Sequence, residues 1–440
     1  MERSERLFGV TIAAVHGTDH LLKRLFPPLV PVWAAAFGYP LWKLGLVVGA
    51  LTFGSAVGQA PIGHLSDRFD RRYLLPTGVG LIGVGVGALA LVPLLGIDDG
   101  ATVAVAGYRF STRLLGMLAA MFVAGLGSAS VHPTGYPLIS ANVSSEHKGT
   151  VLGMWGSASK FGDGLAPAFV GVLLLALAWH GILLAFAALA VLIAVVLFVV
   201  LGRFETRPAS RTEAGDEADA SMRRLWQTDG RVYLYPLTAV FAYFAVQIMA
   251  ASGVTVFLPE FIDSVYGYTV TVAGTSFGTA STASFYFSGM LIVAGVVQLG
   301  TGRLVDRYDE RLVILAYLGV AAAVLAVLGT AVLSPPVLLA ALVVLGASLY
   351  GVNPARDALV GTIAPAELEG RTFGYLWTVT LLGSSVTPAL VGYLGDVAGL
   401  QRAFLLLAGG VLLSALPVAL LLSDRVYLVP GERRDAARAD

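Results

Sequence analysis

The chain has 440 residues, of which only 13% are charged, and its formal net charge at pH 7 is zero. Soluble domains carry about twice that charged fraction, so too few charges remain to cover a water-facing surface. The hydrophobic content of 57% and the mean hydropathy of +0.80 therefore predict a protein whose main solvent is lipid. The balanced charge gives no reason to expect nucleic acid as a partner, and the lack of Cys excludes disulfides and thiolate metal sites.

Twelve apolar stretches are long enough to cross the hydrocarbon core of a bilayer, which takes about 20 helical residues. We expect these spans near residues 7–36, 44–64, 74–95, 112–140, 150–177, 180–201, 232–258, 284–302, 312–333, 336–362, 371–395 and 400–422. Gly and Pro are frequent inside them, which neighbouring helices tolerate by satisfying the freed backbone groups. The pattern predicts an all-α integral membrane protein with twelve transmembrane helices.

The distribution of Lys and Arg between the connecting segments predicts the orientation in the membrane. Twenty of these residues fall on the side of the N-terminus and four on the opposite side. We therefore expect a multi-pass cell-membrane protein with both termini in the cytoplasm. The remaining four basic residues, Lys23, Arg24, Lys160 and Arg356, fall within the spans.

Two bundles of six helices are expected, at 1–202 and 232–440, joined by a polar cytoplasmic linker at 203–231. On the opposite side of the membrane, the long connections at 96–111 and 263–283 are too short to form a catalytic domain. An internal repeat supports this division: Gly63-His-Leu-Ser-Asp-Arg-Phe-Asp-Arg-Arg72 matches Gly302-Arg-Leu-Val-Asp-Arg-Tyr-Asp-Glu-Arg311. Two repeated halves with a binding site between them are typical of transporters.

The repeated segment resembles the signature of the major facilitator superfamily, Gly-x-Leu-x-Asp-Arg-x-x-Arg-Arg, which joins helices 2 and 3 and again helices 8 and 9. The resemblance implies two six-helix bundles, a central cavity lined chiefly by helices 1, 4, 7 and 10, and alternating access. A narrower likeness is to the fosmidomycin-resistance-like exporters, through His16-Gly-Thr-Asp-His20 and Val131-His-Pro133. It implies proton-driven efflux of a small anionic or drug-like compound. Met121 stands where many proton-coupled members carry Arg on helix 4.

The two signature loops are expected to act as conformational latches. A carboxylate at the end of one helix can accept hydrogen bonds from a neighbouring helix N-terminus, and Arg can bind carbonyl groups or a Glu across the bundle interface. The alternative is that the arginines only anchor the cytoplasmic helix ends. The predicted latch residues are Gly63, Asp67, Arg68, Arg72, Gly302, Asp306, Arg307 and Arg311.

Charged residues inside a span are costly and mark function by default. On the first span, His16, Asp19, His20 and Lys23 share one helix face, since they are three or four residues apart. The alternative is that Lys23 and Arg24 only reach toward the outer headgroups. The candidate proton carriers are His16, Asp19, His20, His132 and Asp163, because imidazoles titrate near neutral pH. His16 and His20 also have the spacing of metal ligands, but one such pair is too few, and we predict no metal site and no cofactor.

The candidate substrate-binding residues are Lys23, Arg24, Lys160, Arg356, Tyr243, Gln247 and Asn353. Tyr243 and Gln247 are four residues apart on helix 7, where hydrogen bonding between helices is the alternative role. Three cations have a carboxylate close by in sequence, whereas Arg24 has none left to it. An uncompensated buried cation is expensive unless a ligand supplies an anion, so we expect an anionic or zwitterionic substrate.

Together these features predict a secondary active transporter, not an enzyme, that works as a monomer and exports a small molecule by proton antiport. The sequence has no nucleotide-binding motif, so the energy must come from a gradient or from a partner. The alternatives are a sensor or receptor with a transporter fold, a facilitator without ion coupling, and a membrane metalloenzyme.

Overall fold

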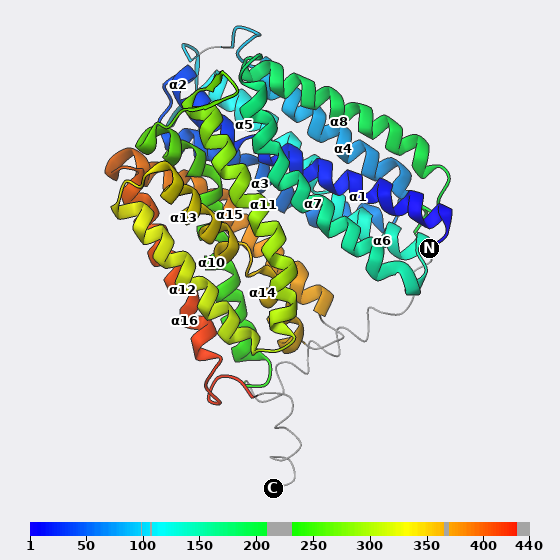
Figure 1. Ribbon diagram of the computed structural model, residues 1–440. Helices are drawn as coiled ribbons and strands as arrows, with labels where there is room; N and C mark the ends of the chain where they lie inside the picture. The colour runs from blue at the N-terminus through cyan, green and yellow to red at the C-terminus, as the bar shows by residue number, and fades with distance from the viewer. Residues whose placement is uncertain (98, 106–107, 209–230, 365–368, 429–440) are drawn as a thin grey trace.

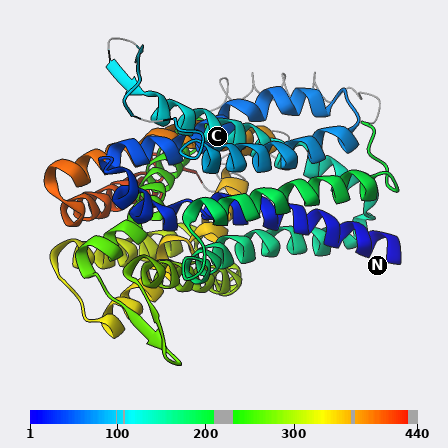
Figure 2. The same ribbon diagram turned by 90° about the horizontal axis from the view of Figure 1, so that it is seen from above.

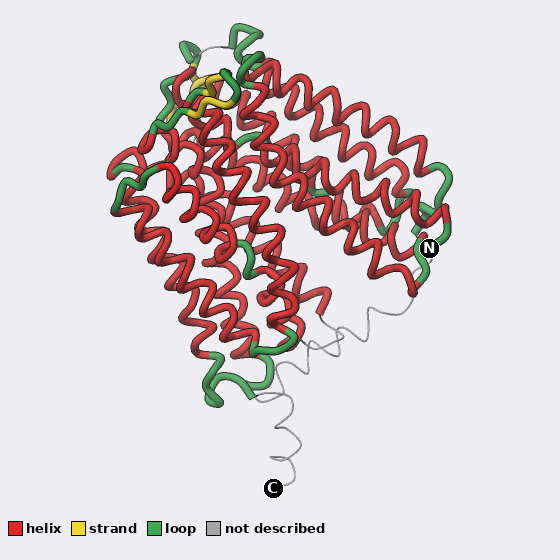
Figure 3. The backbone as a smooth tube through the Cα atoms, viewed as in Figure 1, coloured by secondary structure: helices red, strands yellow, loops and turns green. Residues whose placement is uncertain are grey.

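The computed structural model describes residues 1–97, 99–105, 108–208, 231–364 and 369–428. The predicted linker lies mostly outside the described residues, as do the last twelve residues of the chain. The described residues are almost entirely helical, and strands occur at only one end of the molecule (Figure 3).

The first bundle contains the helices up to residue 201 (Figure 1). They are α1 (Arg3–Arg24), the 3-10 turn η1 (Pro27–Leu29), α2 (Val30–Phe37), α3 (Leu41–Ser66), α4 (Arg71–Leu91), α5 (Thr112–Ser128), α6 (Val131–Asn142), α7 (Ser145–Leu173) and α8 (Trp179–Leu201). The second bundle contains α10 (Leu234–Phe261) with the π turn η2 (Ile262–Tyr266), α11 (Thr279–Val305), α12 (Glu310–Thr330), α13 (Pro335–Leu349), α14 (Asn353–Ile363), α15 (Glu369–Ala398) and α16 (Leu400–Leu420).

Helices lie at all twelve predicted spans, and three of the spans are broken. The first is broken around Pro27 and Pro28, the fourth just before His132 and Pro133, and the tenth just before Pro354. Proline lacks the N–H that a helix interior requires and clashes with the preceding turn. Each break interrupts the helix inside a predicted span.

Ten helices among the described residues are long and apolar enough to cross a membrane. The two spans below that standard are formed by α1 and α7, which carry His16, Asp19, Asp163 and Lys160 in their interiors. Since a lipid-exposed charge is costly, these two helices must turn their charged faces toward protein. These two spans thus carry most of the charged candidate site residues.

Two small hairpins, predicted only as loops, stand at one end of the molecule. Antiparallel strands β1 (Thr102–Val105) and β2 (Tyr108–Ser111) form one, and β3 (Val270–Val272) and β4 (Thr275–Phe277) form the other. Seen from above, they project on opposite sides, one from each bundle (Figure 2). The second hairpin turns through Ala273 and Gly274, both with positive φ, as a two-residue hairpin loop requires. We call this end the hairpin end, and the opposite end, which carries residues 1 and 202–208, the linker end.

The two bundles pack against each other at the hairpin end and diverge toward the linker end (Figure 1). Helix α3 lies along α15, and α7 lies along α11. The first contact is close because it is made by glycine: a Cβ at Gly49 would lie 2.0 Å from the Ser385 carbonyl oxygen, and one at Gly45 would lie 2.3 Å from that of Pro388. At Gly153, Gly302 and Gly374, nearer the linker end, a Cβ would meet nothing within 4 Å among the described residues.

A carboxylate from one bundle caps a helix of the other at the hairpin end. The N-cap of α3 is Pro40, which has no side chain able to accept a hydrogen bond. Instead, Asp396 at the end of α15 accepts hydrogen bonds from the backbone N–H groups of Leu41, at 2.8 Å, and Trp42, at 3.0 Å. A carboxylate at a helix N-terminus also interacts favourably with the helix dipole. This cap exists only while the bundles are together at this end.

We therefore predict that Asp396→Asn weakens closure at the hairpin end. The amide keeps one acceptor oxygen and loses the charge, which together cost about 0.5–2 kcal/mol at a helix N-terminus. Because the natural chain has no Cys, spin labels can be placed selectively at the exposed residues Val103 and Thr271 through cysteine substitutions. Distance measurements between the labels should show a larger population of separated hairpins. Asp424→Asn, at an exposed aspartate of the linker end, is the matched control, and identical distance distributions in all three proteins would contradict the role of Asp396.

Candidate functional site

The charged face of α1 packs on α7 through two glycines. A Cβ at Gly162 would lie 2.2 Å from the Gly17 carbonyl oxygen, and one at Gly17 would lie 3.0 Å from that of Ala158. This close approach brings the side chains on either side of Gly17 within reach of α7. His16 stacks on Trp155, with 4.1 Å between ring centroids, and its Nδ1 lies 2.8 Å from the Trp155 carbonyl oxygen.

His16, His20 and His132 come together in one group, which we call the histidine cluster. The His16 ring centroid lies 4.7 Å from that of His20 and 5.0 Å from that of His132, in both cases edge to face. One ring nitrogen from each residue lies within 4.8 Å of the others. The third imidazole reaches α1 because the break between α5 and α6 places His132 at the start of α6. The structure thus joins three of the predicted proton carriers.

Asp19 and Lys23 form the ion pair that their spacing predicted. The Lys23 ammonium donates to Asp19 Oδ2 at 2.8 Å. Asp19 is buried, with 1% of its surface exposed, whereas a quarter of the Lys23 side chain is accessible. The other carboxylate oxygen, Oδ1, is buried and has no hydrogen-bond partner within the described part of the chain. Leaving a buried acceptor in that state is costly, and a polar ligand would remove the cost.

Asp163 of α7 accepts from two residues of α1 at once. Arg24 Nε donates to Asp163 Oδ1 at 2.8 Å, and His20 Nδ1 donates to the same oxygen at 3.1 Å. The expectation that Arg24 lacks a partner is therefore wrong. It rested on proximity in sequence, and the pairing joins residues 139 positions apart. Lys160, which we expected to pair with Asp163, lies 3.9 Å from its Oδ2, and 36% of the Lys160 side chain is exposed.

Arg356, the cation predicted to bind substrate in the second bundle, is buried against aromatic rings. Its guanidinium lies 4.4 Å from the ring centroid of Phe244 and 5.4 Å from that of Trp377. It also pairs with Asp357 at 2.9 Å, and half of the Asp357 side chain is accessible. Stacking on two rings favours a cation by its attraction to their π faces. Lys160 in the first bundle interacts electrostatically with Arg24, Arg356 and Asp357, so the charged groups of both bundles act on one central region.

The neutral candidates lie in different surroundings. Gln247 is buried and donates through Nε2 to the Leu349 carbonyl oxygen at 3.1 Å, which ties α10 to α13. Tyr243 is also fully buried, whereas Asn353 is half-buried at the start of α14. We did not predict Tyr350, which lies at the break before α14, bonds Thr255 at 2.6 Å and interacts with Arg24. A tyrosine just before a proline-containing break was the signal available in the sequence.

The predicted latch residues lie at the linker end, where the bundles are apart. Arg72 donates to the Phe198 carbonyl oxygen at 3.2 Å, and Arg311 donates to that of Leu421 at 2.6 Å, each within its own bundle. The expected binding of carbonyl groups across the interface is therefore not what these two arginines do here. Asp67 and Asp306 are exposed, and neither carboxylate has a hydrogen-bond or ion-pair partner among residues that the structure describes. Arg68 and Arg307 are exposed beside them.

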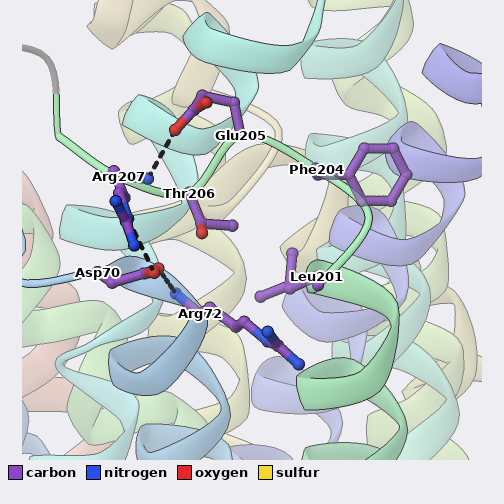
Figure 4. A pocket seen from close by; sticks show the side chains of 8 residues that line it. Asp70, Arg72, Leu201, Phe204, Glu205, Thr206 and Arg207 are labelled. Carbon is purple, nitrogen blue, oxygen red and sulfur yellow. Dashed lines mark hydrogen bonds and ion pairs between the residues drawn. The ribbon is translucent and has the colours of Figure 1, made fainter.

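A surface pocket at the linker end is separate from the charged centre (Figure 4). Asp70 caps α4 by accepting from the Arg72 N–H at 2.9 Å, and the Arg207 guanidinium lies 3.9 Å from the same carboxylate. Glu205 accepts from the Arg207 N–H at 3.0 Å. The contacts hold the segment that follows α8 against the first signature loop. We therefore assign the residues that line the pocket a structural role.

The central charges do not balance. Among the described residues, four cations meet there, Lys23, Arg24, Lys160 and Arg356, and three carboxylates, Asp19, Asp163 and Asp357. With neutral imidazoles, one positive charge is in excess. That surplus belongs to Lys160, which has the longest ion-pair distance and the most exposed side chain of the four.

Solved transporters share this architecture. A bacterial homologue of the human lysosomal transporter Spinster, solved in an inward-facing and occupied conformation, aligns with a TM-score of 0.76 at 14% identity, over 98% of this chain and all of that one. A D-xylose-proton symporter aligns with a TM-score of 0.75 at 16% identity, over 96% of this chain and 98% of that one. At these identities the likeness establishes the fold alone.

Relatives are also found by sequence. An uncharacterized MFS-type transporter of Bacillus subtilis, YfnC, is 23% identical over 97% of this chain and 93% of its own length. An uncharacterized MFS-type transporter of Methanocaldococcus jannaschii is 26% identical over 146 residues, a third of each chain. The family model of the Major Facilitator Superfamily matches residues 12–291 and 270–438. Together with the two repeated bundles, this match shows that the chain belongs to the Major Facilitator Superfamily.

Proposed function

We propose that this protein is a secondary active transporter that moves a small anionic or zwitterionic compound across the cell membrane by alternating access. The observation that carries the proposal is the surplus cation at the centre of the molecule, on the accessible Lys160 side chain. A positive charge whose counter-ion is already paired with another cation is unfavourable in the interior of the protein, and an anionic ligand removes that cost. Arg24 and Arg356 interact electrostatically with Lys160, so they would share the ligand's charge.

The arrangement of the bundles represents one access state. If both termini are cytoplasmic, as the Lys and Arg distribution favours, the closed hairpin end faces outward and the protein is open to the cytoplasm. The glycine contacts of α3 with α15 and the Asp396 cap then stabilise the inward-open state.

Proton coupling would act through Asp19 and Asp163, with the histidine cluster beside them. A proton on Asp19 releases Lys23 and adds to the positive charge of the site, so a purely anionic cargo and a proton favour each other's binding. Export by proton antiport instead requires a cargo that competes with the proton. A zwitterion or drug-like compound meets that requirement, because its cationic group can take the place of Lys23 on Asp19. We therefore propose proton-coupled efflux of such a compound.

Counterflow in proteoliposomes tests transport itself. A ligand found by a thermal-shift screen is loaded inside vesicles, and entry of the labelled compound is followed. Exchange that exceeds protein-free vesicles is expected of a transporter. A ligand that stabilises the protein but is not exchanged would identify a sensor and overturn the proposal.

We predict that Lys160→Gln weakens binding of the best carboxylate, phosphate or phosphonate by at least about 1.5 kcal/mol, the scale of a charged hydrogen bond, or roughly tenfold. Arg24→Gln should have a similar effect, because Lys160 would then neutralise Asp163. Lys148→Gln, near the linker end of the same helix α7, is the matched control. Thermal-shift titration gives the affinities. Unchanged affinity in Lys160→Gln, or a cation as the best ligand, would show that the surplus charge does not select the substrate.

Asp19→Asn is expected to uncouple transport from protons. The amide cannot exchange a proton, so flux should persist down a substrate gradient and lose its response to an imposed pH gradient. Flux is measured in proteoliposomes with and without a protonophore. Glu146→Gln, at an exposed carboxylate of α7, should respond like the natural protein. If the natural protein itself ignores pH gradients and protonophores, proton coupling is ruled out.

The exposed carboxylates Asp67 and Asp306 are expected to engage only when the linker end closes. Each would then accept hydrogen bonds from a neighbouring helix N-terminus in the other bundle. We predict that Asp67→Asn and Asp306→Asn each slow transport severalfold while substrate affinity stays within a few fold, since neither residue touches the central site. Stopped-flow uptake and thermal-shift titration separate the two effects. Unchanged rates in both variants would refute the latch.

A further inference from the structure

The histidine cluster has the composition and orientation of a metal centre. We propose that His16, His20 and His132 bind one divalent transition-metal ion of the Zn²⁺ type, with a coordination position left open beside the half-buried His20 and His132. The inference goes beyond the proposed transport function and does not depend on it. From the sequence we predicted no metal site, because His16 and His20 alone are too few ligands; the break before α6 supplies the third.

The orientation of His16 is the first support. Its Nδ1 lies 2.8 Å from the Trp155 carbonyl oxygen, which can only accept, so Nδ1 carries the proton and Nε2 carries the lone pair. Nε2 is buried and has no hydrogen-bond partner in the described ranges, and only 5% of the residue is exposed. Leaving such an acceptor unsatisfied is costly. A metal ion is one ligand that would satisfy it.

His20 is held in the same tautomer by a different group. Its Nδ1 donates to Asp163 Oδ1 at 3.1 Å, which leaves Nε2 free to act as a ligand. Metal-binding histidines usually donate their second nitrogen to a carbonyl or a carboxylate, which fixes the ring and raises its basicity. His16 donates to a carbonyl oxygen, and His20 donates to a carboxylate.

The distances allow coordination after a small contraction. The three ligand atoms lie within 4.8 Å of one another, whereas nitrogens around tetrahedral Zn²⁺ are about 3.3 Å apart, given bonds of about 2.0 Å. His20 and His132 are only half-buried, so their rings have room to move toward the fixed His16. Imidazole ligands favour Zn²⁺, Co²⁺, Ni²⁺ or Cu²⁺ over Mg²⁺ and Ca²⁺, which prefer oxygen.

The charges around the cluster decide what fills the open position. Asp19 and Asp163 lie beside the histidines, but both are already paired with cations. A divalent ion would add to the surplus positive charge of the centre. An anionic fourth ligand relieves that charge, whichever anion supplies it. Metal and anion are therefore expected to bind together.

The test uses the whole protein in detergent, purified without a polyhistidine tag and titrated with Co²⁺ as an optical probe. We expect equilibrium dialysis to show one tightly held Co²⁺ per chain, with the visible bands of four- or five-coordinate cobalt that Zn²⁺ abolishes. His16→Ala and His132→Ala should each weaken binding by more than about 100-fold, beyond the 10–100-fold expected for loss of a supporting partner. Asp163→Asn should cost that smaller amount.

His64→Ala is the matched control, since His64 is exposed at the linker end, and it should bind Co²⁺ like the natural protein. His132→Ala tests the site even if the buried His16 proves necessary for folding, because His132 is partly accessible. Two outcomes would overturn the proposal and leave the cluster as a proton site. One is that the natural protein does not retain Co²⁺, and the other is that His16→Ala and His132→Ala both retain it as well as the natural protein does. None of these measurements involves transport, so their outcome is independent of the proposed function.

Discussion

The centre of the molecule depends on the hydrogen bonds and the ion pair of the Asp163 carboxylate. One buried carboxylate accepts from Arg24 and His20 of α1 and lies within ion-pair distance of Lys160 of its own helix. Burying a charge is tolerated only when partners and hydrogen bonds replace water. The glycines at 17 and 162 supply the backbone proximity that makes those bonds possible. Because the carboxylate cannot neutralise every cation around it, the site retains a positive charge.

The features that could be predicted from the sequence are those that depend on one helix alone. The twelve spans follow from apolar length, their breaks from proline, and the pair of Asp19 and Lys23 from helical spacing. The partner of Arg24 could not be found in that way, because it lies on another helix 139 residues away. Similarly, His132 joins His16 through the relative placement of α1 and α6. Periodicity describes one helix at a time, whereas a membrane site is assembled from several.

The two ends of the molecule differ in how they use carboxylates. At the hairpin end, Asp396 crosses from one bundle to cap α3 of the other. At the linker end, the repeat-related Asp67 and Asp306 point into solvent, while Arg72 and Arg311 fasten helices within their own bundles. A carboxylate that is satisfied in one state and hydrated in the other contributes only a small difference in free energy. Small differences suit a protein that must visit both states.

Part of the surface between α3 and α15 is built from backbone, since Gly45 and Gly49 face carbonyl oxygens. Interlocked side chains resist sliding, because each must leave its groove before the helices can part. Glycine has no side chain that could interlock in this way. The two helices can therefore separate or glide along each other without a change of rotamer, so little friction is expected when the molecule changes shape.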